Sequence, residues 1–149
     1  MGHLRLQLAS DGDGTGELFV AFEANGFSGH GSAWFDVANL AEAATQFAKY
    51  PLPKNPLVCI AGGNWSDKLP LALVEEHLHI SAYPTNARGG ICLRVKTIYT
   101  LTGDGQRESK YFASAELRSS YEQLRHFSNA LIALTRGETE EVVLDEKDV

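Results

Sequence analysis

The sequence has few of the features that mark disulfide-stabilised or membrane proteins. Only two of its 149 residues are cysteines, Cys59 and Cys92. Each lies in a short apolar run, where a free cysteine behaves as a small hydrophobic residue, so we expect both to be unpaired. No apolar run approaches the ~18 residues that a membrane-spanning helix needs, and the N-terminus lacks a secretory signal pattern. We therefore expect a cytoplasmic protein without a membrane partner.

Positive charge is also scarce. The chain has 13 Lys and Arg against 19 Asp and Glu, a formal net charge of −6. Nucleic acids and anionic membranes reward an excess of basic residues, so we expect no nucleic-acid partner, while a basic protein partner remains open. Hydrophobic residues make up 44% of the chain, which is typical of a globular protein. We expect one domain over residues 1–144 and a charged, frayed tail over 145–149.

Apolar residues alternate with polar ones in many short segments, as expected for half-buried strands. The strongest local signal is the Asn-Gly dipeptide at residues 25–26, which favours a two-residue hairpin turn. Such a turn sets Phe22 opposite Gly29 and Val20 opposite Gly31, so that large side chains cover glycines.

Two segments have helical periodicity. Asp36 is a suitable cap for a helix that extends to about Tyr50, and Ser119 with Glu122 forms a capping box for a second helix that ends before Gly137. Together the patterns predict an α+β domain with an antiparallel sheet of about seven or eight strands and two amphipathic helices packed on one face.

The segment Gly-Phe-Ser-Gly-His-Gly-Ser-Ala-Trp-Phe at residues 26–35 is followed by Asp36, a helix and Tyr50-Pro51-Leu52. It resembles small uncharacterised bacterial proteins in which a Gly-x-Gly-Ser-Ala-Trp-Phe hairpin leads into a helix. The resemblance covers about a third of the chain and implies a bacterial origin and an antiparallel sheet with two helices. It supplies no catalytic residues. Some similar small acidic proteins encoded beside toxins act as immunity proteins, which is an analogy of function only.

Catalytic motifs are missing from the sequence. There is no Gly-x-Ser-x-Gly elbow, no phosphate-binding loop and no dinucleotide fingerprint. The acidic run at residues 11–17 matches only the start of a calcium loop, and the closing Glu is replaced by Phe22. His77 and His79 supply two ligands on one strand face, fewer than a zinc site needs. We expect no metal, no cofactor and no catalytic residue set.

One face of the sheet carries the candidate ligand-binding residues. Pairing the apolar strand faces by setting Leu78 opposite Val95, and Val95 opposite Ala113, places His77 beside Lys96 and His79 beside Arg94. The result is a cationic strip that could bind a small anion, or serve an enzyme that uses one. Its members are His77, His79, Arg94, Lys96 and Lys110. The alternative is an ordinary solvated sheet face, since antiparallel sheets commonly leave one face wet.

A second set of residues points to a protein partner. Phe19, His30, Trp34 and Phe112 fall on the polar faces of their strands. Aromatic residues are enriched in the cores of protein interfaces. These positions favour a non-catalytic interaction module, immunity-like or homodimeric through its exposed sheet face. A flat face bearing aromatic residues supports this reading, whereas a concave pocket around His77, His79 and Arg94 supports the anion-binding alternative.

Overall fold

The computed structural model describes residues 1–103 and 106–148, with side chains described for 1–100 and 110–148. The turn expected around residues 104–105 therefore lies outside the described residues. The described part contains eight strands and two helices: β1 (His3–Ser10), β2 (Thr15–Ala24), β3 (Phe27–Asp36), α1 (Val37–Gln46), β4 (Val58–Trp65), β5 (Leu73–Pro84), β6 (Gly90–Gly103), β7 (Gln106–Ser120), α2 (Tyr121–Thr135) and β8 (Val142–Asp145).

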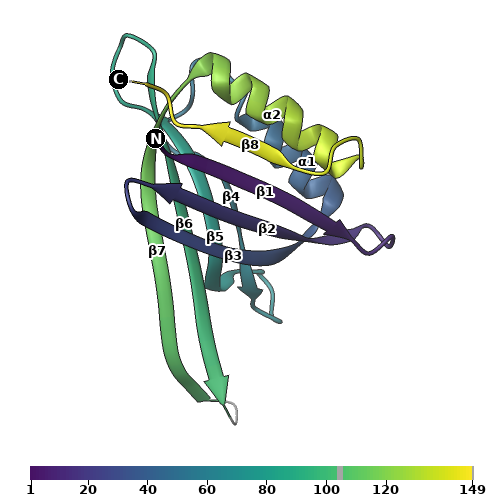
Figure 1. The fold of residues 1–149 in the computed structure, drawn as a ribbon. Coiled ribbons are helices and arrows are strands. Elements are labelled where there is room, and N and C mark those ends of the chain that lie inside the picture. The colour runs from purple at the N-terminus through teal and green to yellow at the C-terminus, as the bar shows by residue number, and fades with distance from the viewer. Residues whose placement is uncertain (104–105, 149) are drawn as a thin grey trace.

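The strands form two four-stranded antiparallel sheets (Figure 1). The first sheet has the order β3-β2-β1-β8 and the second the order β4-β5-β6-β7. Strands of the two sheets cross at a steep angle, and α1 and α2 pack side by side behind the first sheet (Figure 1). The expected α+β class, with eight antiparallel strands and two helices, is confirmed. The division into two sheets is an additional feature that the sequence pattern did not show.

Both helices begin at side-chain caps. The Asp36 carboxylate accepts the Asn39 N–H at 3.0 Å, as expected, and α1 ends at Gln46, four residues before the expected Tyr50. The cap of α2 is Ser120, whose Oγ accepts the Gln123 N–H at 3.1 Å, one residue after the predicted capping box. Neither helix is long and apolar enough to cross a bilayer, within the part of the chain that the structure describes.

The β2–β3 hairpin has the predicted register. Phe22 lies opposite Gly29 and Val20 opposite Gly31, around a turn in which Asn25 and Gly26 both have positive φ. Large buried side chains of β2 therefore lie beside the glycines of β3 on the inner face of the first sheet, where the glycines themselves add no side-chain bulk.

The second sheet crosses β3 at those glycines. A Cβ atom built on Gly29 would lie 2.5 Å from Thr97 Oγ1 and 2.7 Å from the Ala113 Cβ, closer than real side chains approach. A Cβ on Gly31 would lie 3.3 Å from both the His77 carbonyl oxygen and the Thr97 Cβ. Only a strand without side chains at these positions can lie this close to β6 and β7.

The pairing within the second sheet differs from the prediction by two residues. Leu78 lies opposite Thr97, and Val95 lies opposite Ile80 and Ala115. Because side chains repeat every two residues, a two-residue shift keeps every apolar side chain on the expected face and changes only its neighbours. The β5–β6 loop fixes the true register, since Asn86 Oδ1 accepts the N–H groups of Arg88 and Gly90 inside that loop.

The C-terminal residues are held against the second sheet. Asp145 belongs to β8, beyond the expected end of the domain at residue 144. The Glu146 N–H donates to the Gly2 carbonyl at 2.8 Å, and the Lys147 N–H donates to the Arg118 carbonyl at 2.8 Å. These two hydrogen bonds place Glu146 and Lys147 beside Gly2 and Arg118, and the fraying of the tail stays a prediction.

The two cysteines lie on strands that are not neighbours. Cys59 is exposed on β4 and Cys92 is buried on β6, with β5 between them, and both are free. Adjacent strands are about 4.8 Å apart, so two cysteines separated by a third strand exceed the Cα separation of about 7 Å that a disulfide allows.

Replacing Gly29 with alanine tests the close crossing of the sheets. We expect Gly29→Ala to lower the free energy of unfolding by about 1–3 kcal/mol, because the added methyl group overpacks the contact with Thr97 and Ala113. Ser28→Ala is the matched control, since Ser28 is exposed on the other face of the same strand. Its effect should stay within about 0.5 kcal/mol. Urea unfolding of the two variants measures the difference, and equal stabilities would contradict the crossing.

Candidate functional site

The outer face of the first sheet carries exposed aromatic and polar side chains. Alternation along β2 buries Leu18 and Val20 and leaves Phe19 between them 42% exposed. The same alternation exposes His30 and Trp34 on β3. The outward positions predicted for these three residues are therefore correct.

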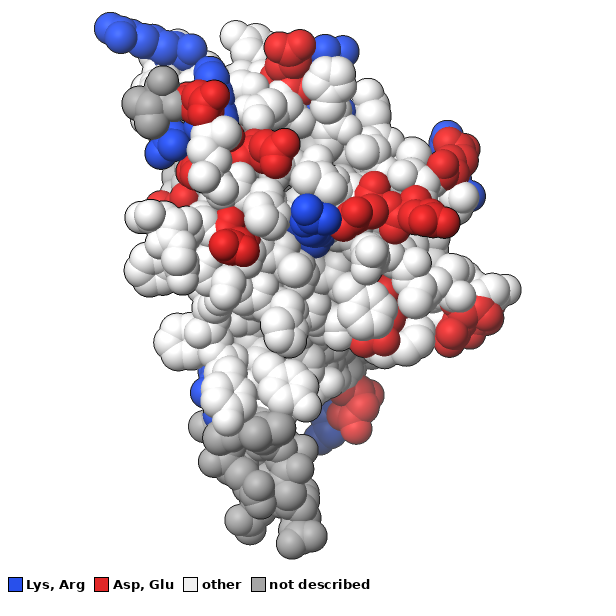
Figure 2. Space-filling model, viewed as in Figure 1, with Lys and Arg blue, Asp and Glu red and all other residues white. Residues whose placement is uncertain are grey.

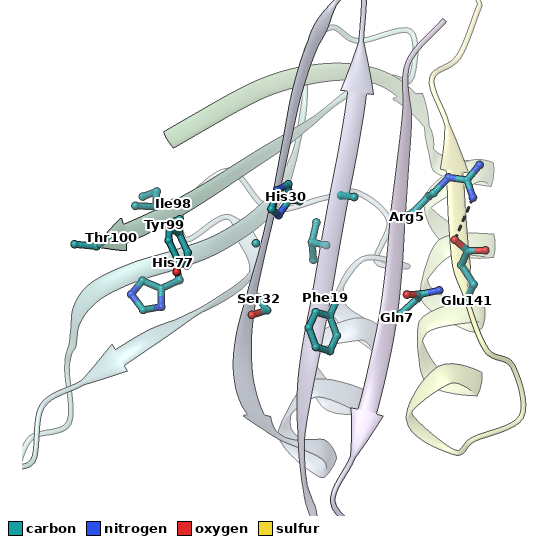
Figure 3. Close-up of a pocket in the computed structure, with 13 residues that line it drawn as sticks. Arg5, Gln7, Phe19, His30, Ser32, His77, Ile98, Tyr99, Thr100 and Glu141 are labelled. Carbon is teal, nitrogen blue, oxygen red and sulfur yellow. Dashed lines mark hydrogen bonds and ion pairs between the residues drawn. The ribbon is translucent and has the colours of Figure 1, made fainter. Parts of the chain in front are cut away.

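A cavity of about 460 Å³ lies where this outer face meets the second sheet (Figure 3). Its volume is in the range of ligand-binding pockets. One wall comes from β1, β2 and β3 and the other from β5 and β6 beyond the edge of β3. The residues that line it are Arg5, Gln7, Phe19, Val20, Ala21, His30, Gly31, Ser32, His77, Ile98, Tyr99, Thr100 and Glu141. We call this cavity the aromatic corner.

The aromatic corner continues into a shallower hollow of about 310 Å³ over β6 and β7. The two share His30 and Tyr99, and Tyr111 and Phe112 line the hollow further along. Tyr99 is 58% exposed and Phe112 76% exposed. Phe19 from the first sheet and Tyr99 and Tyr111 from the second thus lie along one concave surface. Phe112 alternates with Tyr111 on β7 and borders the hollow from the strand's other face.

The charged groups of the aromatic corner are paired with one another. Arg5 Nη1 lies 3.2 Å from Glu141 Oε1, and His77 Nε2 lies 2.7 Å from Glu75 Oε1. The Ser32 hydroxyl donates to Glu17 Oε2 at 2.7 Å. Figure 2 shows the same face of the molecule, where few charged residues lie over β2, β3 and the described part of β6 and β7. A partner here meets mainly aromatic and neutral polar surface.

The cationic strip is not formed as predicted. A bulge between β4 and β5 pairs Gly62 with Leu78 and Gly63 with Glu76, so His77 is an extra residue. This irregularity separates the two histidines: His77 lines the aromatic corner, whereas His79 lies opposite Lys96. The expectation that both histidines share one face was wrong because the bulge interrupts the alternation on which it rested.

The basic residues of the proposed strip have acidic partners. Glu76 carries Oε1 at 3.1 Å from Lys96 Nζ and Oε2 at 3.3 Å from His79 Nδ1. Lys110 lies opposite Thr100, away from these residues. The aromatic corner contains His77 without His79 or Arg94, and Arg94 lines a separate small hollow. The pairing with Glu76 removes much of the positive charge that an anion would need.

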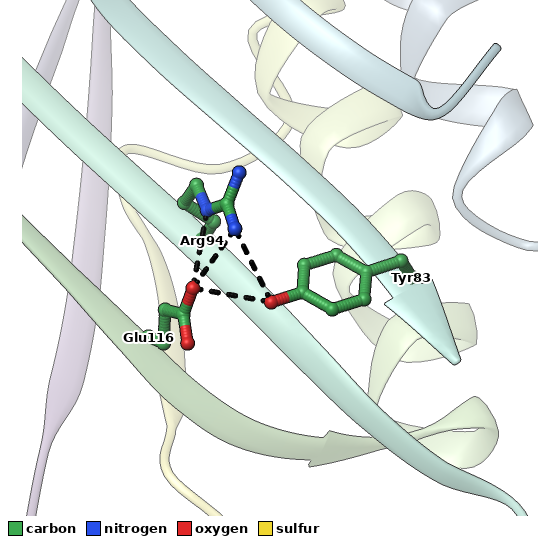
Figure 4. Close-up of polar contacts among 3 residues, drawn as sticks. All are labelled: Tyr83, Arg94 and Glu116. Carbon is green, nitrogen blue, oxygen red and sulfur yellow. Dashed lines mark hydrogen bonds and ion pairs between the residues drawn. The ribbon is translucent and has the colours of Figure 1, made fainter. Parts of the chain in front are cut away.

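Arg94 belongs to a separate polar network on the second sheet (Figure 4). Its Nη2 donates to Glu116 Oε1 at 2.9 Å, and the Tyr83 hydroxyl donates to the same oxygen at 3.1 Å. Hydrogen bonding with Cys92, burial and the neighbouring Glu116 carboxylate raise the pKa of Tyr83 to about 12. The hydrogen bonds from Arg94 and Tyr83 hold the pKa of Glu116 below its ordinary value. These groups satisfy one another, which is the arrangement of a structural network.

The predicted partner-binding residues divide between two places. Phe19, His30 and Phe112 lie along the aromatic corner and its hollow, whereas Trp34 lines a different cavity with Trp65. Sequence reasoning missed Tyr99. Its position on β6, four residues beyond Val95, the last buried apolar residue that the structure describes on that strand, was a signal of exposure.

The described residues contain no metal-binding cluster. No group of three or more His, Cys, Asp or Glu side chains among them could hold a metal ion. Asp13, from the incomplete calcium loop, accepts the Thr15 hydroxyl at 2.6 Å and the Thr15 N–H at 3.0 Å, and the hydroxyl contact is the main reason its pKa lies below the ordinary value.

Comparison of the chain with protein-family models, with curated proteins and with solved structures found no match.

Lys96 provides a test of the electrostatics around His79. Burial lowers the pKa of His79 below its ordinary value of 6.5, Glu76 opposes this effect, and the charge of Lys96 adds to the lowering. We expect Lys96→Gln to raise the pKa of His79, because the protonated imidazole then faces one positive charge fewer. Lys110→Gln removes the same charge from a distant part of the sheet and is the control. NMR titration of the imidazole measures both, and an equal change in the two variants would contradict the register.

Proposed function

We propose that this chain is a non-catalytic protein-interaction module that binds a protein partner in the aromatic corner. The observation that carries the proposal is the concave surface shared by Phe19, His30 and Tyr99 from the two sheets. Interface hot spots concentrate in aromatic side chains near the centre of a water-excluding contact. The paired charges around the cavity suit this role, because they can remain satisfied when a partner covers them.

An immunity-like role is the form of this proposal that agrees best with the rest of the chain. The domain is small and acidic, and its hairpin resembles that of small bacterial proteins of the kind described above. An acidic chain attracts a basic protein partner over a long range, which increases the association rate. A homodimer formed through the same face is the second form of the proposal.

The anion-binding alternative has less support. It requires free cations that converge on one cavity, whereas Lys96 and Arg94 contact Glu76 and Glu116. Arg94 lines a small hollow with Tyr83 on the second sheet, apart from the cavity that contains His77.

Truncating the two central aromatic residues tests the proposal. The wild-type chain, used as bait in extract of its source cells, should retain a partner that is then purified and titrated calorimetrically. We expect Phe19→Ala combined with Tyr99→Ala to weaken binding by at least ~2 kcal/mol, or about 30-fold, because hot-spot aromatics typically contribute that much each.

Trp65→Ala is the matched control, since Trp65 is 52% exposed but lines a different cavity. Its affinity should equal that of the wild type. Sedimentation of the bait alone reveals the homodimeric form. The proposal fails if the double variant binds every retained protein as tightly as the wild type does and also self-associates to the same extent.

A further inference from the structure

The second sheet ends in a strand with an open edge. β7 pairs with β6 on one side only. On its other side the chain's own C-terminal segment meets it at one residue: the Arg118 N–H donates to Glu146 Oε2 at 3.1 Å, and the Arg118 carbonyl accepts the Lys147 N–H at 2.8 Å. The backbone groups of Arg118 therefore point away from β6 and are capable of pairing.

Residues nearer the start of β7 also have backbone N–H and C=O groups that point away from β6. Backbone groups of every second residue point the same way, so those of Lys110, Phe112, Ser114 and Glu116 also point away from β6. The pairing with β6 is regular throughout this segment. Within the described part of the chain no hydrogen bond reaches these outward backbone groups. We call these four residues the β7 edge.

The β7 edge has little of the protection that sheet edges usually carry. Natural edge strands are blunted by proline, bulges, several charges or a covering segment. Lys110 to Glu116 contains no proline and no bulge. The side chain of Phe112 at its centre is 76% exposed. A regular strand that carries an exposed aromatic residue and unpaired backbone groups is suited to β-strand addition.

The β2–β3 turn overhangs this edge. Going from Phe35 toward Phe27, β3 crosses β4 at Gly62, β5 at His77, β6 at Thr97 and finally β7 at Ala113. Phe27 lies two residues past the last crossing at Gly29, which corresponds to roughly 7 Å of strand. An added strand would lie about 4.8 Å from β7, and so beneath the turn. Figure 1 shows the end of the hairpin reaching the side of β7.

The overhang decides which occupant fits. If two copies paired their segments Lys110–Glu116 with each other, a two-fold axis perpendicular to the sheet would lie midway between the two Ala113 residues. Both β2–β3 turns would then lie on the same side, and they would collide, because each reaches roughly 7 Å past its own β7 while the two β7 strands would be only about 4.8 Å apart. A single extended segment from another protein brings no such turn and fits beneath the overhang.

We propose that the β7 edge takes up an extended segment of a partner protein as a fifth, antiparallel strand of the second sheet. The side chains of the edge specify the chemistry of this segment: an apolar residue beside the exposed Phe112, an acidic residue beside Lys110 and a basic residue beside Glu116, at alternate positions. Glu116 uses its Oε1 for Arg94 and Tyr83, so the basic residue would contact its Oε2. Small or apolar residues between them face the β2–β3 turn. Phe112 also borders the hollow that continues from the aromatic corner, but the pairing groups of the edge lie on the far side of β7 from β6, and the proposal requires no partner at Phe19 or Tyr99.

A synthetic peptide tests the proposal directly. The probe is acetyl-Ser-Lys-Val-Thr-Val-Val-Thr-Glu-Ser-amide, added to about 1 mM to the 15N-labelled full chain, a concentration at which even a weak complex is populated. We expect saturable shifts in the amide signals of Phe112, Ser114 and Glu116. The same peptide with proline in place of its first threonine loses the N–H that would donate to the Ser114 carbonyl, and it should bind at least ten times more weakly.

Two variants of the chain complete the test. Ser114→Pro removes an outward N–H from an edge strand, where proline is tolerated, and should weaken binding at least tenfold. Phe112→Ala should weaken it several-fold and serves if the proline variant does not fold. Trp65→Ala is the matched control and should bind normally, because Trp65 is an exposed aromatic residue on β4, at the opposite edge of the same sheet. The proposal is overturned if the edge amides do not shift, or if the proline peptide binds equally well. It is equally overturned if the wild type self-associates in sedimentation and Ser114→Pro abolishes that association, since a second copy then fills the edge.

Discussion

The close crossing of β3 over the second sheet is the contact on which the rest of the structure depends. At Gly29 and Gly31 the backbone of one sheet rests directly on Thr97, Ala113 and the carbonyl of His77. Side chains at these glycines would hold the sheets apart, because ordinary face-to-face packing separates them by about 10 Å. The crossing also ends the first sheet at β3, so that the second sheet extends past it and the aromatic corner forms in the angle between them.

This arrangement explains why the exposed aromatic residues gather where they do. Phe19 faces outward because its neighbours on β2 enter the core, and Tyr99 is exposed because β6 continues beyond the cover of the first sheet. The two side chains belong to different sheets and share a cavity only because the sheets cross. Acidic residues that pair with Arg5 and His77 leave this surface without concentrated positive charge, which favours recognition of a protein over recognition of an anion.

Local signals in the sequence were sufficient for much of the fold. The Asn-Gly turn determined the β2–β3 register, and alternation assigned the buried faces of β5, β6 and β7. Alternation cannot detect a two-residue shift, so the neighbours of Leu78 and Val95 were wrong. Nor can it detect a bulge, and the one beside Gly63 moved His77 from the proposed strip to the aromatic corner. The meeting of Phe19 with Tyr99 depends on the crossing of two sheets, which no local pattern records.

The most direct test of this account is a through-space NMR measurement between the two sheets. The crossing places the α-protons of Gly29 against the Ala113 methyl group, since a Cβ at Gly29 would lie 2.7 Å from that of Ala113. The account predicts a strong NOE between these groups, with a second between Gly31 and the Thr97 methyl group. Absence of both cross-peaks from a spectrum that shows the intrasheet contacts of β3 would contradict it.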